Sequence, residues 1–393
     1  MGATAHRPMC VCAGCAVWRD AELMVGESRA GRVEFETAGL YDPDAPGATN
    51  RLALLEWLVE EGATLGQLVE ADAVDGLVTL AAKLAWHAGE GLTLGELAAQ
   101  AGLAPEQVEQ LRTVVGLAPL DPNDPRFIAD DVAAFSAFNM GAAFFGEAAT
   151  LHFGRVLGNA VARIAEASMS LFARTVEGPL RAQGANELAL AQAYLDATRL
   201  LDIVPGLMTR VFQAHVDQAM HRPHPWQGDS ARLAVGFVDI AGFTPLSGRL
   251  SAAELVELVT DFEGRAVEVV APRDGRVVKL IGDEVMFTAP DAACGCDIAL
   301  ALCAAFQALP LAVQPRGGIA IGDMLAWGGD IYGPTVNMAA RIADLALPFE
   351  ILVDTDVRDE AVKQTPDLSF EPAGRRHLKG FDQPATLWST ARA

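Results

Sequence analysis

The sequence predicts a multi-domain protein in which an all-α N-terminal region precedes an α+β domain of ferredoxin-like arrangement. Three observations predict this. The chain has 393 residues, enough for two domains. Apolar residues recur at helical spacing from Arg51 to about residue 214, where strand patterns are almost absent. After residue 232, short apolar runs alternate with amphipathic helices.

In the N-terminal half, residues 1–50 show little periodicity, whereas "RLALLEWLVEEG" (51–62) predicts a helix that ends at a glycine. The motif Thr-Leu-Gly-[Gln/Glu]-Leu begins at Thr64 and again at Thr93. The second copy resembles a helix-turn-helix, with Gly102 at the turn and Pro105 opening the next helix. Long alanine-rich helices are predicted at 129–166, 167–183 and 186–203.

The segment 215–231 changes character, since it holds three of the seven histidines together with Pro223 and Pro225. We interpret it as a linker. The predicted domains are therefore an N-terminal segment (1–50), a helical domain (51–214), the linker (215–231) and a C-terminal domain (232–393).

In the C-terminal domain, "RLAVGFVDI" (232–240) predicts a strand. Ser251 and Glu254 form a capping-box pattern at the start of the next helix. The β-α-β-β-α-β order is ferredoxin-like, and we expect an antiparallel sheet with helices on one face. The other predicted elements are a helix (251–270), a hairpin after the turn at 273–276, a helix (291–309), strand-turn-strand (316–328), a helix (335–346) and a strand (350–354).

Composition argues against a general nucleic-acid binder, because the net charge is −22 and no basic cluster stands out. An acidic chain that handles a phosphorylated substrate must neutralise the phosphate charge locally, with a few placed cations or with metal ions. We see no signal peptide and no apolar stretch of ~18 residues. We therefore expect a cytoplasmic protein, and leave peripheral membrane association open.

Six cysteines form two groups, one near the N-terminus and one in the C-terminal domain. The N-terminal group lacks a clear fourth metal ligand, so a structural or disordered interpretation is favoured over a metal site. The second lies in an alanine-rich helix and is typical of small buried thiols. The groups are Cys10, Cys12, Cys15 and Cys294, Cys296, Cys303.

Two aspartates stand at the ends of apolar strands: Asp239 ends "VGFVD", and Asp283 lies at a hairpin tip. Adjacent strands can bring both to one edge of a sheet. Paired carboxylates suit Mg²⁺ or Mn²⁺, which keep positions free for substrate phosphates. The alternative is that both aspartates merely cap turns, and spacing alone favours that alternative over a metal site.

Four motifs then point to a family: "FVDIAGFTPLS" (237–247), "VKLIGDEVMF" (278–287), "RGGIAIG" (316–322) and "DIYGPTVNMAARI" (330–342). In order and spacing they resemble the class III nucleotidyl cyclase catalytic domain, over about 160 residues from Arg232 onward.

The resemblance implies a role for each matching position. Asp239 and Asp283 would bind two Mg²⁺ or Mn²⁺ ions per active site, helped by the backbone carbonyl of Ile240. Lys279 and Asp330 would select adenine, because guanylate cyclases typically place Glu and Cys there.

The remaining positions would act on the rest of ATP. Asn337 would orient the ribose and Arg341 would stabilise the transferring α-phosphorus. Arg316 and Lys379 would contact the terminal phosphates. The implied reaction converts ATP to 3′,5′-cyclic AMP and pyrophosphate, and family sites built from two subunits imply a homodimer.

The helical half resembles the autoinhibitory modules of actinobacterial cyclases that respond to pH or fatty acids. Two alternatives remain open. One is a DNA-binding helix-turn-helix regulator whose cyclase-like domain senses nucleotide; the other is a dimerisation scaffold. "LTLGELAAQAGLAPEQVEQL" contains no cation before Arg112, so no nucleic-acid partner is expected.

Regulation could involve His215, His221 and His224, since histidine is the side chain that ordinarily changes charge between pH 5 and 8. A fatty acid entering near "FNMGAAFF" (138–145) could bias the same equilibrium. The alternative is that these histidines are merely solvated linker residues.

Overall fold

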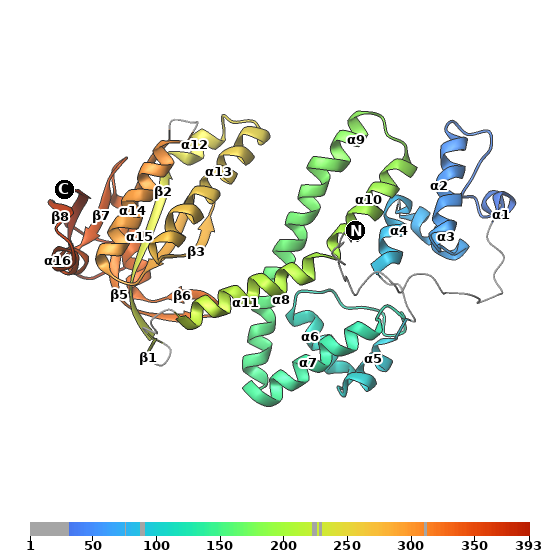
Figure 1. The fold of residues 1–393 in the computed structure, drawn as a ribbon, viewed down its shortest axis with the longest axis horizontal. Coiled ribbons are helices and arrows are strands. Elements are labelled where there is room, and N and C mark those ends of the chain that lie inside the picture. The colour runs from blue at the N-terminus through green and yellow to red at the C-terminus, as the bar shows by residue number, and fades with distance from the viewer. Residues whose placement is uncertain (1–30, 75, 87–90, 222–225, 228–229, 310–312) are drawn as a thin grey trace, which may run out of the picture. The chain divides into compact units, whose positions relative to one another are not determined.

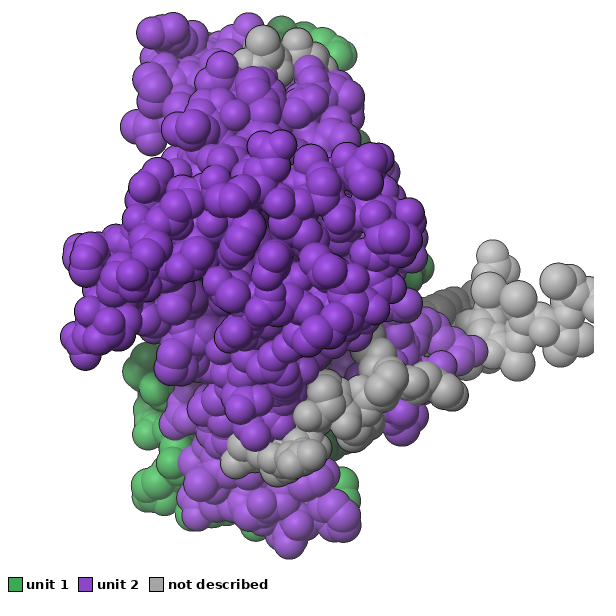
Figure 2. Space-filling model, turned by 90° about the vertical axis from the view of Figure 1, so that its left-hand side faces the viewer, with its two compact units in different colours: residues 1–113, 117–140, 160–208 green, residues 114–116, 141–159, 209–393 purple. Residues whose placement is uncertain are grey.

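The structure is a computed structural model, and it describes residues 31–74, 76–86, 91–221, 226–227, 230–309 and 313–393. The chain divides into two compact units (Figure 2). One unit comprises residues 1–113, 117–140 and 160–208, and the other comprises residues 114–116, 141–159 and 209–393. In the part of the chain described, no helix has the length and hydropathy needed to span a membrane.

The N-terminal half is helical, as predicted (Figure 1). Helices begin before residue 51, because the short α1 and the first turn of α2 lie in the segment that shows little periodicity. The helices are α1 (Arg32–Thr37), α2 (Ala48–Glu60), α3 (Leu65–Ala73), α4 (Leu77–Trp86), α5 (Leu94–Ala101), α6 (Pro105–Val114), α7 (Ala129–Phe145), α8 (Glu147–Phe172), α9 (Gly178–Ala182), α10 (Glu187–Leu201) and α11 (Val204–His221).

The repeated pentapeptide is a helix-start signal. Thr64 caps α3 and Thr93 caps α5, each accepting a hydrogen bond from the backbone amide three residues on. Gln67 and Glu96 return the contact to the capping residue's own amide, which completes a capping box in both copies. Gly102 then ends α5 in the left-handed conformation, with φ of 69°.

The predicted boundaries of the long helices were wrong in two places. The helix predicted at 129–166 is two helices, because Gly146 adopts a φ of 89° between α7 and α8. No new helix begins at residue 167, since α8 continues to Phe172 and passes through a π-helical turn (173–177) into α9. An alanine-rich sequence shows helical periodicity but does not indicate where one helix ends and the next begins.

The predicted linker is partly helical. α11 continues to His221, so His215 lies on an exposed helical turn rather than in irregular chain. His224 lies outside the described residues. Pro223 and Pro225 lie outside the described residues as well.

The C-terminal half contains the predicted β-α-β-β-α-β order in β2, α13, β3, β4, α14 and β5. The sheet order is β3-β4-β2-β5-β7-β9-β8, whose first four strands have the ferredoxin-like arrangement. Ser251 caps α13 through the predicted capping box. The elements are β1 (Trp226–Gln227), β2 (Ser230–Ala241), α12 (Phe243–Ser247), α13 (Ala252–Val270), β3 (Arg276–Ile281), β4 (Glu284–Ala289), α14 (Ala292–Gln307), β5 (Gln314–Trp327), β6 (Asp330–Tyr332), α15 (Pro334–Leu345), β7 (Ile351–Asp354), α16 (Thr355–Gln364), β8 (Leu368–Arg376) and β9 (Ala385–Arg392).

Helices cover both faces of this sheet, which corrects the expectation of one covered face. α13, α14 and α16 share a core with one set of alternating strand residues, including Val238. α15 packs on the opposite face with Val235 and Phe237. Gly318 permits this second layer, because a Cβ there would lie 2.2 Å from the backbone nitrogen of Ala343. The sheet is also not wholly antiparallel, since β5 and β7 run parallel.

The segment 316–328 is one strand rather than strand-turn-strand. β5 runs unbroken from Gln314 to Trp327, and the reversal comes at Gly328 and Gly329. Gly322 lies within the strand and makes room for Thr335. A Cβ at Gly322 would lie 2.6 Å from the Thr335 hydroxyl oxygen.

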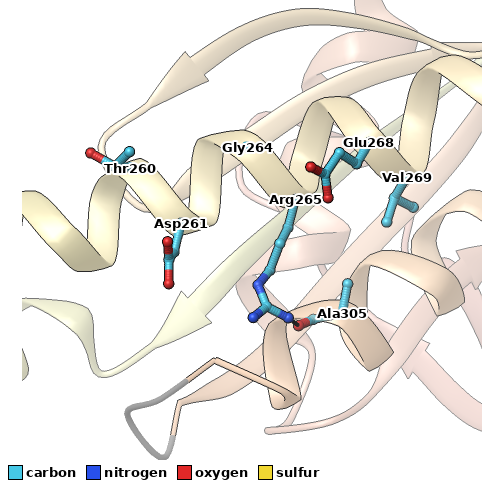
Figure 3. Close-up of a pocket in the computed structure, with 7 residues that line it drawn as sticks. All are labelled: Thr260, Asp261, Gly264, Arg265, Glu268, Val269 and Ala305. Atoms are coloured by element: carbon cyan, nitrogen blue, oxygen red, sulfur yellow. Dashed lines mark hydrogen bonds between the residues drawn. The ribbon is translucent and has the colours of Figure 1, made fainter.

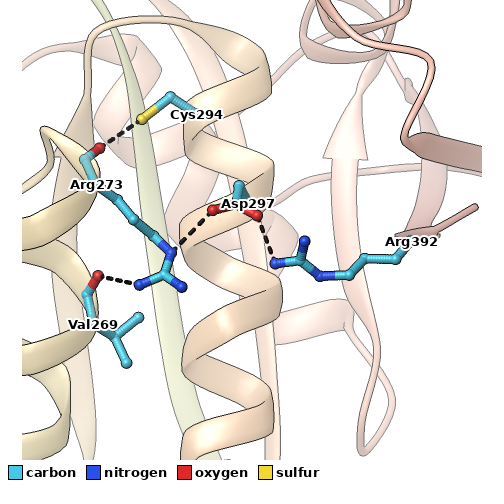
Figure 4. Close-up of polar contacts among 5 residues, drawn as sticks. All are labelled: Val269, Arg273, Cys294, Asp297 and Arg392. Carbon is cyan, nitrogen blue, oxygen red and sulfur yellow. Dashed lines mark hydrogen bonds and ion pairs between the residues drawn. The ribbon is translucent and has the colours of Figure 1, made fainter.

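Two members of the second cysteine group are buried, as predicted, and the third is only half-buried. Cys294 is half-buried and donates a 2.9 Å Sγ hydrogen bond to the Arg273 carbonyl, while Asp297 accepts from Arg273 and Arg392 (Figure 4). Cys296 and Cys303 are buried. Burial raises the pKa of all three thiols to about 12, so they stay protonated. Cys10, Cys12 and Cys15 lie outside the described residues.

A buried acid at the end of β7 yields a stability prediction. Asp354 caps α16 by accepting a 2.8 Å hydrogen bond from the Val357 amide, and burial raises the pKa of Asp354 from 3.8 to about 6. At pH 8 the Asp354 carboxylate is charged in both the folded and the unfolded protein, and burial of that charge destabilises the folded protein. Asp354→Asn keeps a capping oxygen and removes the charge.

We therefore expect Asp354→Asn to raise the free energy of unfolding at pH 8 by up to ~3 kcal/mol, at about 1.4 kcal/mol per pH unit between the two pKa values. The gain should shrink as pH falls through 6, because the native wild-type carboxyl becomes neutral. Thermal unfolding of both proteins between pH 8 and pH 5 measures the difference. A gain that does not change with pH would show that charge burial is not its cause.

Candidate active site

Asp239 lies near the end of β2, between β4 and β5. Its register partners are Glu284 on β4 and Arg316 on β5, so the sheet sets two acids and a cation side by side. Only 17% of the Asp239 side chain is exposed. The neighbouring Ile240 is buried, which fixes its backbone at the sheet's end.

Asp283 lies in the turn between β3 and β4. Burial raises its pKa, and the charge of Asp239 raises it further, although backbone amides including that of Ile240 hydrogen-bond the carboxylate and oppose the shift. The adjacent Glu284 is affected more strongly. Burial and the charges of nearby carboxylates, Asp239 first among them, raise the pKa of Glu284 to about 7.

Arg316 is the counter-ion of this acidic cluster. Its Nε donates to Asp239 Oδ1 at 2.8 Å and its Nη2 to Oδ2 at 3.0 Å, a bidentate pair. Nη1 donates to the carbonyls of Asp344 and Ala346, each at 3.2 Å. All four of these contacts are to groups of the chain itself, and the contact to the terminal phosphates that the resemblance implies for Arg316 stays a prediction.

The cluster fits a divalent cation by its donor chemistry. Asp239, Asp283 and the Ile240 carbonyl offer only oxygen ligands, the kind that Mg²⁺ and Mn²⁺ prefer. Burial first, and then the charges of neighbouring carboxylates, raise the pKa values of Asp283 and Glu284, while the charge of Arg316 acts in the opposite direction. No three His, Cys, Asp or Glu side chains within the described ranges form a closed metal-binding group. Two protein carboxylates would leave coordination positions to substrate.

The predicted adenine-selecting residues meet directly. Lys279 Nζ lies 2.6 Å from Asp330 Oδ2, joining β3 to the start of β6. Asp330 Oδ1 accepts from the Ile331 amide at 2.8 Å. Burial raises the pKa of Asp330, but the bonds from Lys279 and Ile331 and nearby positive charge outweigh it, so the net shift is downward.

The other predicted residues are more exposed. Asn337 and Arg341 stand four residues apart on α15, hence on the same face of the helix. Arg341 Nη1 contacts Asp344 Oδ2 at 3.0 Å. Lys379 is exposed in the turn between β8 and β9.

The sequence interpretation overlooked Glu284 and Arg276. Glu284 stands inside the quoted "IGDEVMF" motif, and an acid at the start of an apolar strand was the available signal. Arg276 donates from Nη2 to the Gly329 carbonyl at 2.9 Å, a contact between segments 53 residues apart that no local pattern reveals.

Two pockets lie apart from these residues. One, about 450 Å³, is formed by α13 and Ala305 of α14, where Arg265 Nη1 donates to the Ala305 carbonyl (Figure 3). The other, about 620 Å³, lies in the helical half between residues 39–51 and 181–190. Neither includes residues 138–145. Instead, Met140, Phe144 and Phe145 in that segment are exposed.

The helix-turn-helix segment does not offer its cation outward. Arg112 Nη2 donates to the Ala118 carbonyl at 2.9 Å, and its guanidinium lies 5.5 Å from the centre of the Phe127 ring. DNA recognition needs such cations free for phosphate and base edges.

Comparison with known proteins identifies the class of both halves. A family model described as the adenylate cyclase regulatory domain matches residues 34–220. A second, the adenylate and guanylate cyclase catalytic domain, matches residues 228–390. The solved adenylyl cyclase CyaB from P. aeruginosa superposes with a TM-score of 0.38 at 23% identity, covering 42% of this chain and 95% of its own.

Relatives along most of the chain place it more narrowly. An uncharacterised protein of Mycobacterium tuberculosis is 32% identical over 89% of this chain and 91% of its own length. An adenylate cyclase of Streptomyces coelicolor is 31% identical over 68% of this chain and 70% of its own. A pH-sensitive adenylate cyclase of M. tuberculosis is 28% identical over 90% and 91%. The chain belongs to the class III adenylate cyclases that carry an N-terminal regulatory domain.

Proposed function

We propose that this protein converts ATP to 3′,5′-cyclic AMP and pyrophosphate, and that its N-terminal half regulates the reaction. The observation that carries ATP as substrate is the 2.6 Å Lys279–Asp330 pair. Adenine presents an acceptor at N1 beside a donor at the 6-amino group, whereas guanine reverses that order. A lysine donor fixed beside an ionised carboxylate acceptor therefore suits one purine. Named relatives that are adenylate cyclases support the same choice.

The reaction forms a bond between the ribose 3′-oxygen and the α-phosphorus, breaks the bond to pyrophosphate and releases the hydroxyl proton. Asp239, Asp283 and the Ile240 carbonyl would hold two Mg²⁺ or Mn²⁺ ions. When bound, these ions lower the pKa of the 3′-hydroxyl and stabilise the phosphate oxygens.

The chain's other residues position the substrate. Asn337 would orient the ribose and Arg341 would present a cationic fork to the developing phosphate charge. Arg316 pairs with Asp239, so a contact from Arg316 to phosphate would require it to give up part of that pair. Lys379, exposed in its turn, is the more accessible candidate for the terminal phosphates.

Each site would be shared between two subunits. The chain carries one copy of the carboxylate cluster and one Lys279–Asp330 pair, and the family resemblance assigns these to opposite subunits. A homodimer would then hold two composite sites.

Removing a metal ligand should abolish turnover. We expect Asp239→Asn and Asp283→Asn to lower cyclic AMP formation by about 100-fold or more, because each loses a charged ligand of an ion that supplies several kcal/mol. Asp261→Asn, on α13 beside the pocket at Ala305 and apart from the carboxylate cluster, is the matched control. Mn²⁺ should raise the melting temperature of wild type and control but not of the two ligand variants. Normal turnover in either ligand variant would refute the metal assignment.

Mixing two inactive variants should restore activity if sites are composite. In a mixed dimer of Lys279→Ala and Asp283→Ala chains, one site has both lesions and the other is intact. With full subunit exchange, half the dimers are mixed, so about one quarter of wild-type activity should return. Absence of recovery, with exchange shown by differently tagged chains, would instead place each site within one subunit.

For regulation we propose that pH acts through the segment that joins helical residues 51–214 to the domain at 232–393, with a fatty acid as a further candidate input. The named pH-sensitive relative spans 90% of this chain, which supports pH as the signal. His215 is exposed near the end of α11, and protonation there adds charge to a helix that leads into the catalytic region.

Replacing His215, His221 and His224 together with Gln should flatten the pH–activity profile of the full chain between pH 5.5 and 8, because the titrating groups are gone. His377→Gln, outside this segment, is the control and should keep the wild-type profile. Rates of cyclic AMP formation measure both. If the triple variant keeps the wild-type shape, the pH response belongs elsewhere.

A further inference from the structure

A second arginine, Arg276, hydrogen-bonds the turn that immediately precedes Asp330. β5 and β6 form a hairpin in which Trp327 pairs with Asp330, leaving Gly328 and Gly329 as a two-residue loop. Both glycines have positive φ, 61° and 80°, as a type I′ turn requires. Asp330 therefore follows directly on the tightest part of the turn, and its direction depends on how the preceding peptide is held.

An irregularity in β3 brings two cations to this hairpin. Arg276 pairs with Thr288 and Lys279 pairs with Met286. The two pairs are therefore three positions apart along β3 but only two positions apart along β4. Val278 is the extra residue of a β-bulge. Because Thr288 and Met286 share one face of β4, Arg276 and Lys279 also share a face.

The two cations act on neighbouring groups. Arg276 Nη2 donates to the Gly329 carbonyl at 2.9 Å, which belongs to the peptide that joins Gly329 to Asp330. Lys279 Nζ contacts the Asp330 carboxylate at 2.6 Å. One cation therefore fixes the backbone and the other the side chain, and Arg276 also adds positive charge that favours the ionised acceptor.

We propose that Arg276 is a positioning residue for purine selection: it holds the Gly329–Asp330 peptide so that Asp330 faces the 6-amino group of adenine. This rests on the proposed function, because it assumes that Asp330 contacts the purine. Arg276 touches neither substrate nor metal in this proposal, and acts only through the hairpin.

The test compares two substrates in the full-length enzyme. Purine riboside triphosphate lacks the 6-amino group but keeps N1, so the ratio of kcat/KM for ATP to that for this analogue reports the Asp330 contact. We expect a ratio of about ten or more in wild type, the usual size for a hydrogen bond to a charged group. Arg276→Ala should lower the ratio towards that of Asp330→Ala. Arg276→Lys, which retains a cationic donor, should keep most of it.

The controls separate the possible failures. A general loss of structure lowers kcat/KM equally for both substrates and leaves their ratio unchanged. An unchanged ratio in Arg276→Ala therefore overturns the proposal. The double variant Arg276→Ala/Asp330→Ala should have the same ratio as Asp330→Ala alone, and a further fall would also overturn it. Arg375→Ala, an exposed arginine on β8, should match wild type. A wild-type ratio near one would instead refute the purine role of Asp330 itself.

Discussion

The catalytic half depends on holding several carboxylates at one end of a sheet. The register that places Asp239 between Glu284 and Arg316 also places Asp283 close enough for its pKa to respond to the Asp239 charge. Without a cation such a cluster repels itself, and partial burial increases the cost. The bidentate Arg316 pair is the compensation that the protein itself supplies. The strand register and the Arg316 pair together therefore hold these carboxylates in place.

The two candidate clusters stand on different kinds of support. Asp239 and Glu284 lie on the inner strands β2 and β4, whose neighbours on both sides and helices on both faces leave the backbone little freedom, and Asp283 lies in the turn that leads into β4. The Lys279–Asp330 pair rests nearer the sheet's edge, on β3 and the short β6. Edge elements have fewer ladder partners, so side-chain contacts must supply the rigidity that neighbouring strands supply at the centre.

The sequence predicted the parts of the fold that local patterns encode. The capping box at Ser251, the turn at Gly102 and the β-α-β-β-α-β order are confirmed, because each depends on residues close in the chain. The break at Gly146 was missed, since a single glycine in an alanine-rich run is compatible with a continuing helix. The predicted strand-turn-strand at 316–328 gave no reason for its glycines, which is tertiary: α15 approaches Gly318, and Thr335 approaches Gly322. The family motifs pointed to Lys279 and Asp330 as residues of one function but not to their direct contact, and the Asp239–Arg316 pair was not anticipated at all.

The β-bulge at Val278 gives β3 two phases of alternation within six residues. Before it, odd-numbered Val277 faces the α13 and α14 core; after it, even-numbered Leu280 does so. Deleting or inserting one residue at this point would move the Lys279 side chain to the other face of the sheet, although Lys279 and its neighbours would keep their identities. Comparisons of related chains across this strand must therefore align the bulge first, because an alignment that is one position out would match residues that point to opposite faces.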